Sequence, residues 1–151
     1  MKNYTVLYVC LVMLVLSSCA PKSEITTNTP IFTSTQIDED AIKSWELQGE
    51  AYDAWKKIEQ DWTQAVLNPT LKKHKIKLNC SDCSRVNFKV KLKIDSNGKL
   101  VSYQKLKLNV CGGKSPKGFE QELIKYFTEI TFDKSLNGMV IEAYLGRTLK
   151  C

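Results

Sequence analysis

The sequence of 151 residues has few of the residues on which enzyme active sites depend. Its only histidine, His74, lies in the basic stretch LKKHKIK, where we expect a surface position. A Ser-His-Asp triad or a histidine-bound metal would rest on that single residue. No glycine-rich motif of the kind that cradles phosphate is present. The sequence therefore predicts a protein that is not an enzyme and that has no metal and no cofactor.

The sequence also lacks an apolar run long enough for a comfortable membrane span, which needs about 20 residues. The longest run, Val6 to Leu16, follows Lys2 and precedes small residues, which is the order of a secretory signal. The sequence LSSC that ends at Cys19 resembles the bacterial lipobox. This resemblance implies that Cys19 receives a diacylglycerol and that cleavage removes residues 1–18 as a signal peptide. The alternatives are an uncleaved anchor, or an ordinary signal in which Cys19 is incidental.

The residue after the cysteine bears on the membrane. In Gram-negative bacteria an aspartate there resembles the inner-membrane retention signal, so Ala20 favours the outer membrane, with the domain facing the periplasm. Surface exposure is the alternative. Acyl chains contribute roughly 0.8 kcal/mol per buried CH₂, so two or three chains anchor stably. Residues 19–37, rich in Thr, Ser, Pro and Asn, are then expected to hold the lipidated cysteine and a flexible tether.

Apolar periodicity predicts a single domain over residues 38–151. A helix over 38–66 is expected to begin at three acidic residues and to end before Asn68-Pro69. Apolar positions recur in it at intervals of three and four, and all three tryptophans lie on this stripe: Trp45, Gly49, Tyr52, Trp55, Ile58, Trp62 and Val66. The stripe is expected to pack on the protein's own sheet, with a partner-helix site as the alternative.

The remainder of the domain reads as strand, strand, helix, strand. Residues 86–95 alternate strictly, and the Asn97-Gly98 turn joins them to a second strand over 99–110. A helix runs to about residue 130, and Met139 to Leu149 form the last strand. The fold class is thus α+β: an N-terminal long helix, then β-β-α-β with a three-stranded antiparallel sheet and helices on one face.

Lysines mark the candidate binding face of the sheet. Apolar residues of the second strand change phase from Val101 and Tyr103 to Leu106, which indicates a bulge. The lysines expected to face outward are Lys89, Lys91, Lys93, Lys105 and Lys107. They suit an acidic envelope protein or anionic lipid, and we expect no nucleic acid partner. Lysines on edge strands also block unwanted sheet pairing, which is the commoner reason for them.

Four cysteines remain once Cys10 leaves with the signal and Cys19 is acylated. An even number in an exported chain indicates disulfides. The antiparallel order brings all four to one end of the sheet, so we favour Cys83–Cys111 and Cys80–Cys151 over the swapped pairing. Two alternatives use the same residues: a redox pair of Cys80 and Cys83, and a zinc site of four thiolates.

Residues 86–149 resemble the C-terminal domain of the TonB and TolA proteins. The resemblance is carried by FKVKLKIDSNGKLVSYQKLKL, with Asp95 and Gly98 in its turn, by SPKGFEQELIKYFTEITF, and by GMVIEAYLGRTL. It implies a small sheet-and-helix domain that binds proteins in the periplasm, often through an exposed sheet edge. Members of that family keep an N-terminal membrane helix coupled to an inner-membrane motor and a long spacer. A cleaved signal and a short tether do not fit such a motor link.

The function predicted from the sequence is that of a lipid-anchored, non-enzymatic binding module of the cell envelope. Its partner is an unidentified envelope protein, for example in a secretion, conjugation or transport complex. Two alternatives stay open: a periplasmic thiol–disulfide oxidoreductase that uses Cys80 and Cys83, and an immunity or exclusion lipoprotein.

Overall fold

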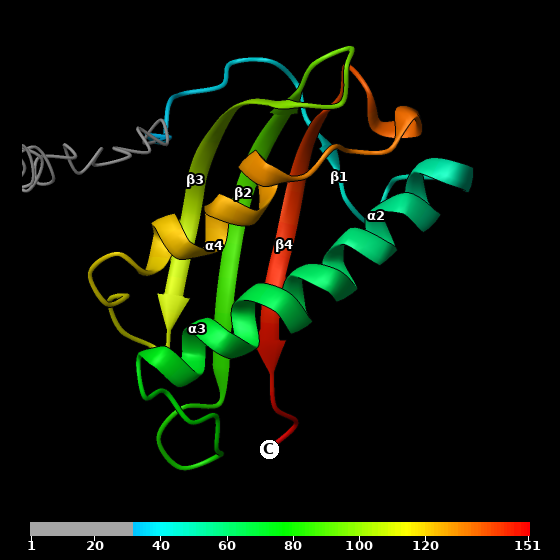
Figure 1. The fold of residues 1–151 in the computed structure, drawn as a ribbon. Helices are drawn as coiled ribbons and strands as arrows, with labels where there is room; N and C mark the ends of the chain where they lie inside the picture. Colours follow the sequence, from blue (N-terminus) through cyan, green and yellow to red (C-terminus); the bar gives the residue numbers. More distant parts are fainter. Residues whose placement is uncertain (1–31) are drawn as a thin grey trace, which may run out of the picture. The chain divides into compact units, whose positions relative to one another are not determined.

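A computed structural model describes residues 32–151 of the chain (Figure 1). Its elements are β1 (Ile42–Lys43), α2 (Gly49–Trp62), the π-helical turn η1 (Thr63–Leu67), α3 (Asn68–Lys73), β2 (Arg85–Ile94), β3 (Leu100–Val110), α4 (Phe119–Glu129), the 3-10 turn η2 (Lys134–Leu136) and β4 (Val140–Thr148). The predicted signal and Cys19 lie outside the described residues. Within residues 32–151, no helix has the length and apolar character needed to cross a membrane.

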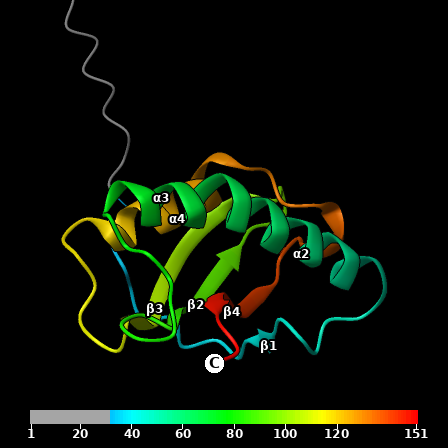
Figure 2. The same ribbon diagram turned by 90° about the horizontal axis from the view of Figure 1, so that it is seen from below.

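The four strands form one sheet in the order β1-β4-β2-β3. β2 pairs antiparallel with both β3 and β4, whereas the two residues of β1 pair parallel to β4. The helices lie on one side of the sheet, and the coil that leads to β1 runs along the other side (Figure 2). The α+β class is therefore confirmed, but the predicted count of three strands is wrong, because two residues before the long helix pair with β4.

The long helix lies later in the chain than its predicted range of 38–66. It begins at Gly49, whose φ of +54° favours glycine, and the acidic residues meant to start it precede β1. Asn68-Pro69 does not end it. The amide of Asn68 donates to the carbonyl of Thr63, five residues earlier, in the π-helical turn η1. The helix thus accommodates Pro69, which has no N–H to donate, and continues as α3 to Lys73.

The hydrophobic core lies between these helices and the inner face of the sheet. Trp55 and Trp62 of the predicted stripe are buried there, and the Trp62 indole donates a hydrogen bond to the carbonyl of Leu123 in α4 at 3.0 Å. Every second residue of β2, from Val86 to Ile94, is buried against them. The stripe therefore packs on the protein's own sheet, as expected. Two residues of the stripe do not pack there: Trp45 precedes the helix and is 54% exposed, and Tyr52 in the first turns of α2 is 39% exposed.

The β2–β3 hairpin confirms the turn and the bulge, but not the whole phase. The Asp95 carboxylate accepts the amides of Asn97 and Lys99, each at 2.8 Å. A side chain at Gly98 would approach the carbonyl of Phe132 to 2.6 Å, so the turn needs glycine. The register slips between Lys89 and Val90, and again between Lys93 and Ile94. The second slip leaves Val101, which was expected in the core, 51% exposed.

Candidate functional site

The predicted lysine face is only partly assembled. Lys89, Lys91 and Lys93 of β2 alternate with the buried residues and therefore lie on the open face of the sheet, away from the helices. Lys107 pairs with Lys89 across the β2–β3 ladder and joins them. Lys105 does not, because the bulge beside it pairs it with the inward-facing Val90. Lys105 instead forms an ion pair with Glu120 of α4, so its predicted place on the face is wrong.

The open face also satisfies most of its own charge. Lys93 forms an ion pair with Glu39, and the Lys91 ammonium donates to the carbonyl of Ile37 at 3.2 Å. Lys89 lies 2.9 Å from the Glu142 carboxylate. Hydrogen bonds with Tyr144 and Glu142 raise the pKa of Lys89, and the bond from Lys89 lowers the pKa of Glu142. These lysines therefore hold residues 37–39 and β4 in place rather than standing free.

A shallow hollow of about 400 Å³ remains on this face beside the end of β4. Its cations on the open face are Lys89 and Lys107, with Asn87 and Thr148 among its polar lining groups; Arg147 also lines it, but pairs with the inward-facing Val86 and so lies on the helix side of the sheet. Within residues 32–151, neither Lys107 nor Arg147 takes part in a salt bridge. The hollow is therefore the least neutralised part of the open face, and it suits a negatively charged group.

An exposed aromatic pair adjoins the same strand. The rings of Trp45 and Tyr144 lie with their centroids 4.5 Å apart, and Tyr144 is 43% exposed. The Lys89 ammonium lies 4.6 Å from the centroid of the Tyr144 ring. Lys89 belongs to β2, so Tyr144 on β4 lies between Lys89 and the β1 strand. The sequence analysis placed Trp45 on the helix and so missed this pair. Only the register of β1 against β4 brings the two residues together.

The outer edge of β3 is covered by the chain's own N-terminal segment. The amide of Thr35 donates to the carbonyl of Tyr103 at 2.9 Å, and the Lys105 amide donates to the Ser34 hydroxyl at 2.8 Å. Ile37, at the end of this segment, is 5% exposed. The tether predicted over residues 19–37 therefore does not reach residue 37: from Phe32 onward the chain is attached to the sheet.

The outer edge of β4 is covered over two residues only. The amide of Ser44 donates to the carbonyl of Glu142 at 2.9 Å, whereas the amides of Leu149 and Ile94 bond across the β2–β4 ladder, to Ser84 and Met139. Antiparallel strands alternate the direction of their backbone groups. The alternation directs the N–H and C=O groups of Tyr144, Gly146 and Thr148 outward. Within residues 32–151 no backbone group bonds to them at that edge.

Gly146 keeps this part of β4 close to β2. Its φ is +141°, and a side chain there would approach the carbonyl oxygen of Val86 to 2.0 Å. The register of β4 on β2 runs through this point without a break, over nine residue pairs. β4 thus offers a regular edge, in contrast to the twice-bulged β3.

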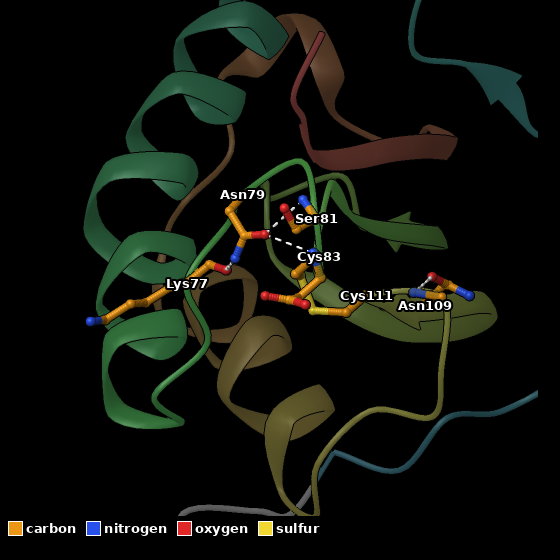
Figure 3. Close-up of a disulfide and its surroundings, with 8 residues drawn as sticks. Lys77, Asn79, Ser81, Cys83, Asn109 and Cys111 are labelled. Atoms are coloured by element: carbon orange, nitrogen blue, oxygen red, sulfur yellow. Dashed lines mark hydrogen bonds between the residues drawn. A yellow bond between two sulfur atoms is a disulfide. The ribbon is translucent and has the colours of Figure 1, made fainter. Parts of the chain in front are cut away.

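Both predicted disulfides are present at the end of the sheet where β2 begins. Cys80 bonds to Cys151 and Cys83 bonds to Cys111, with Cα–Cα distances of 5.6 and 4.3 Å. Figure 3 shows how Asn79 holds the loop that contains Cys80 and Cys83: the side-chain oxygen of Asn79 accepts the amide of Ser81 at 2.9 Å. Cys80 and Cys83 therefore belong to two different bridges, and the four sulfurs form neither a C-x-x-C disulfide nor a four-thiolate site.

His74 is more enclosed than a surface position. Its ring packs edge-on against Phe119, with centroids 5.2 Å apart, and its Nε2 lies 3.1 Å from a Glu122 oxygen. Lys73 reaches the same oxygen at 2.8 Å. Although partial burial opposes it, these two hydrogen bonds hold the pKa of Glu122 below its usual value. The cluster fastens the end of the long helix to α4.

Comparisons of the chain with protein-family models, with curated proteins and with solved structures found no match. The resemblance to the TonB and TolA domain and the lipobox therefore stay predictions. What the structure contributes to the question of function is the geometry of the two sheet edges and of the hollow beside β4.

Proposed function

We propose that this protein is a lipid-anchored, non-enzymatic binding module of the cell envelope that holds an extended segment of a partner protein along the outer edge of β4. The observation that carries the proposal is the row of outward-directed backbone groups at Tyr144, Gly146 and Thr148, which have no partner within residues 32–151. An added strand pairs with such groups through its own main chain.

The hollow beside this edge supplies specificity. Alternate side chains of an added strand lie on the open face of the sheet, where Lys107 is without a salt bridge within residues 32–151. An acidic side chain of the partner fits there, and an apolar or aromatic one fits against Trp45 and Tyr144. We therefore expect the partner segment to be extended and to combine acidic with aromatic or apolar residues.

The proposed anchor at Cys19 would confine this edge to the neighbourhood of a membrane. We favour the periplasmic side of the outer membrane, for an accessory protein of a secretion, conjugation or transport complex. Confinement by a short tether raises the effective concentration of a partner that is bound to the same membrane. A modest affinity at the edge of β4 then suffices.

Photo-crosslinking in cells tests the proposal. A photoreactive residue in place of Thr148 lies on the open edge, and one in place of Ser34 lies on the segment that covers β3. We expect a specific crosslinked envelope protein from position 148 and none from position 34. No product at 148, or the same product at both positions, would contradict strand addition at β4.

A further inference from the structure

The end of the domain that contains the disulfides has a strong and one-sided charge. Three segments meet there: residues 71–86, 106–118 and 146–151, as the pairing of Val86 with both Val110 and Arg147 shows. Together they carry ten lysines and arginines and one acid, Asp82. All ten cations are exposed. Only Lys73 among them forms a salt bridge within residues 32–151. We call these three segments the basic end.

The charge of the molecule is polarised, because the acidic residues lie elsewhere. Residues 38–53, around β1 and the start of α2, carry six acids and one lysine. The start of α2 lies far along the long helix from the basic end (Figure 1). A molecule with such a charge distribution takes a defined orientation on an anionic surface, with the basic end toward it.

The basic end also has an apolar component. A groove of about 480 Å³ lies between the end of the long helix and the last residues of the chain. Leu71, Ile76, Leu78 and Leu149 line it, and each of the last three is partly exposed. Lys72, Lys75 and Lys77 stand around these residues. The combination of leucine and isoleucine with a lysine rim is that of surfaces that lie in the headgroup region of a bilayer.

We propose that the helix side of the basic end, around the leucine-lined groove, is a membrane-contact surface that binds the headgroups of anionic phospholipids; its Lys107 side borders the edge of β4 and is left to the partner strand. The choice of lipid over an acidic protein rests on the proposed anchor at Cys19. Cys19 precedes the first described residue by thirteen positions, and a coil of that length spans about 20 Å on average. Such a tether would keep the whole domain close to the bilayer that holds the anchor.

The disulfides fit this role. Cys80–Cys151 fastens the loop of residues 74–84 to the C-terminal residue beside the groove. A fixed arrangement of cations binds a charged surface without losing loop entropy on contact.

Lysine footprinting of the full chain tests the inference. The chain is reconstituted into phosphatidylcholine vesicles with or without phosphatidylglycerol, and brief acetylation is read by mass spectrometry. We expect Lys75, Lys77 and Lys150 to react several-fold more slowly on the anionic vesicles, and high salt to remove the difference. Lys56 and Lys57, exposed on α2, are internal controls and should react equally on both.

Equal reactivity of Lys75, Lys77 and Lys150 on both vesicles would overturn the inference, and so would equal slowing of the two control lysines. A matched pair of variants repeats the test. K75E/K77E should lose the protection of Lys150, whereas K56E/K57E, with the same change in net charge, should keep it. Loss in both variants would show that net charge alone matters.

The mass of the peptide that contains Cys19 separates this inference from the proposed function. An acylated Cys19 without protection of the basic end would refute the contact surface and leave the anchor standing. Protection of the basic end with an unmodified Cys19 would refute the anchor and leave the contact surface standing.

Discussion

The two outer edges of the sheet differ in every feature that controls strand pairing. β3 has two register slips, lysines at positions 105 and 107, and a covering segment bonded to it at Tyr103 and Lys105. β4 has an unbroken register of nine pairs and a cover of two residues. Bulges, lysines and covering segments are the means by which natural sheets prevent edge pairing. They are concentrated on β3 and absent from the outer half of β4, so within residues 32–151 one edge is closed and the other is left uncovered.

The largest expected effect comes from breaking the regularity of β4 at Gly146. A G146V side chain would overlap the Val86 carbonyl, so β4 must move away from β2. We expect a loss of more than about 4 kcal/mol of unfolding free energy, measured by urea denaturation. The matched control is G112V, at a glycine that also has a positive φ but no atom within 4 Å of the added carbon. Equal losses in the two variants would contradict the close approach.

Removal of the disulfide at the end of β3 is expected to cause the second largest loss of unfolding free energy. The bridge between Cys83 and Cys111 closes 28 residues of sequence separation. C83S/C111S should therefore lose about 3–4 kcal/mol by the chain-entropy relation, again by urea denaturation. C80S/C151S, with a separation of 71, should lose at least as much. Two readily titrated thiols in the untreated protein would show that these bridges are absent and would reopen the redox alternative.

Loosening the segment that covers β3 tests the difference between the two edges directly. Ile37 is buried and ends the segment that covers this edge. I37A should lose about 2–3 kcal/mol. It should also speed amide hydrogen exchange at Thr35, which bonds to Tyr103. T33A, at an exposed position of the same segment, should leave both measurements unchanged. Unaltered exchange at Thr35 in I37A would mean that Ile37 does not hold the cover in place.

Several of these features follow from the sequence, and the reason is that they are local. The alternation of β2, the Asn97-Gly98 turn and the apolar stripe from Trp55 to Trp62 depend on neighbours within a few residues. The gathering of the four cysteines followed as well, because antiparallel topology brings four chain positions to one end of the sheet; it did not by itself separate the favoured pairing from the swapped one.

The errors arose where distant contacts decide the local structure. Asp38 to Asp40 have the composition of a helix start, but Ile37 is buried against the open face of the sheet, and the pairing of β1 with β4 delays the helix to Gly49. Lys105 has the sequence pattern of an outward residue, and only the bulge beside it turns it toward Glu120. The open edge of β4 has no sequence signal at all, because it is defined by where the other strands stop.

Acid should weaken the β4 side of the sheet by a smaller amount. Lys89 lowers the pKa of Glu142 in the folded protein below its ordinary value of 4.5. The stabilisation is therefore complete above pH 4.5 and is lost as pH falls through the folded pKa. We expect E142Q to remove part of the acid slope of unfolding free energy, by about 1 kcal/mol or less. E129Q, at an exposed ion pair with Lys125, should retain the slope. An unchanged slope in E142Q would show that the Glu142 carboxylate does not contribute to the pH dependence of stability.

The most direct test of the central claim, that a partner adds a strand to the outer edge of β4, is the affinity of the captured partner for two variants at one position. T148P removes the outward-directed N–H and leaves the β2 ladder, whereas T148A keeps that N–H and removes the side chain. We expect T148P to weaken binding by about five- to tenfold, as for the loss of one hydrogen bond, and T148A to bind as the natural chain does. Equal affinities of the two variants would contradict the account.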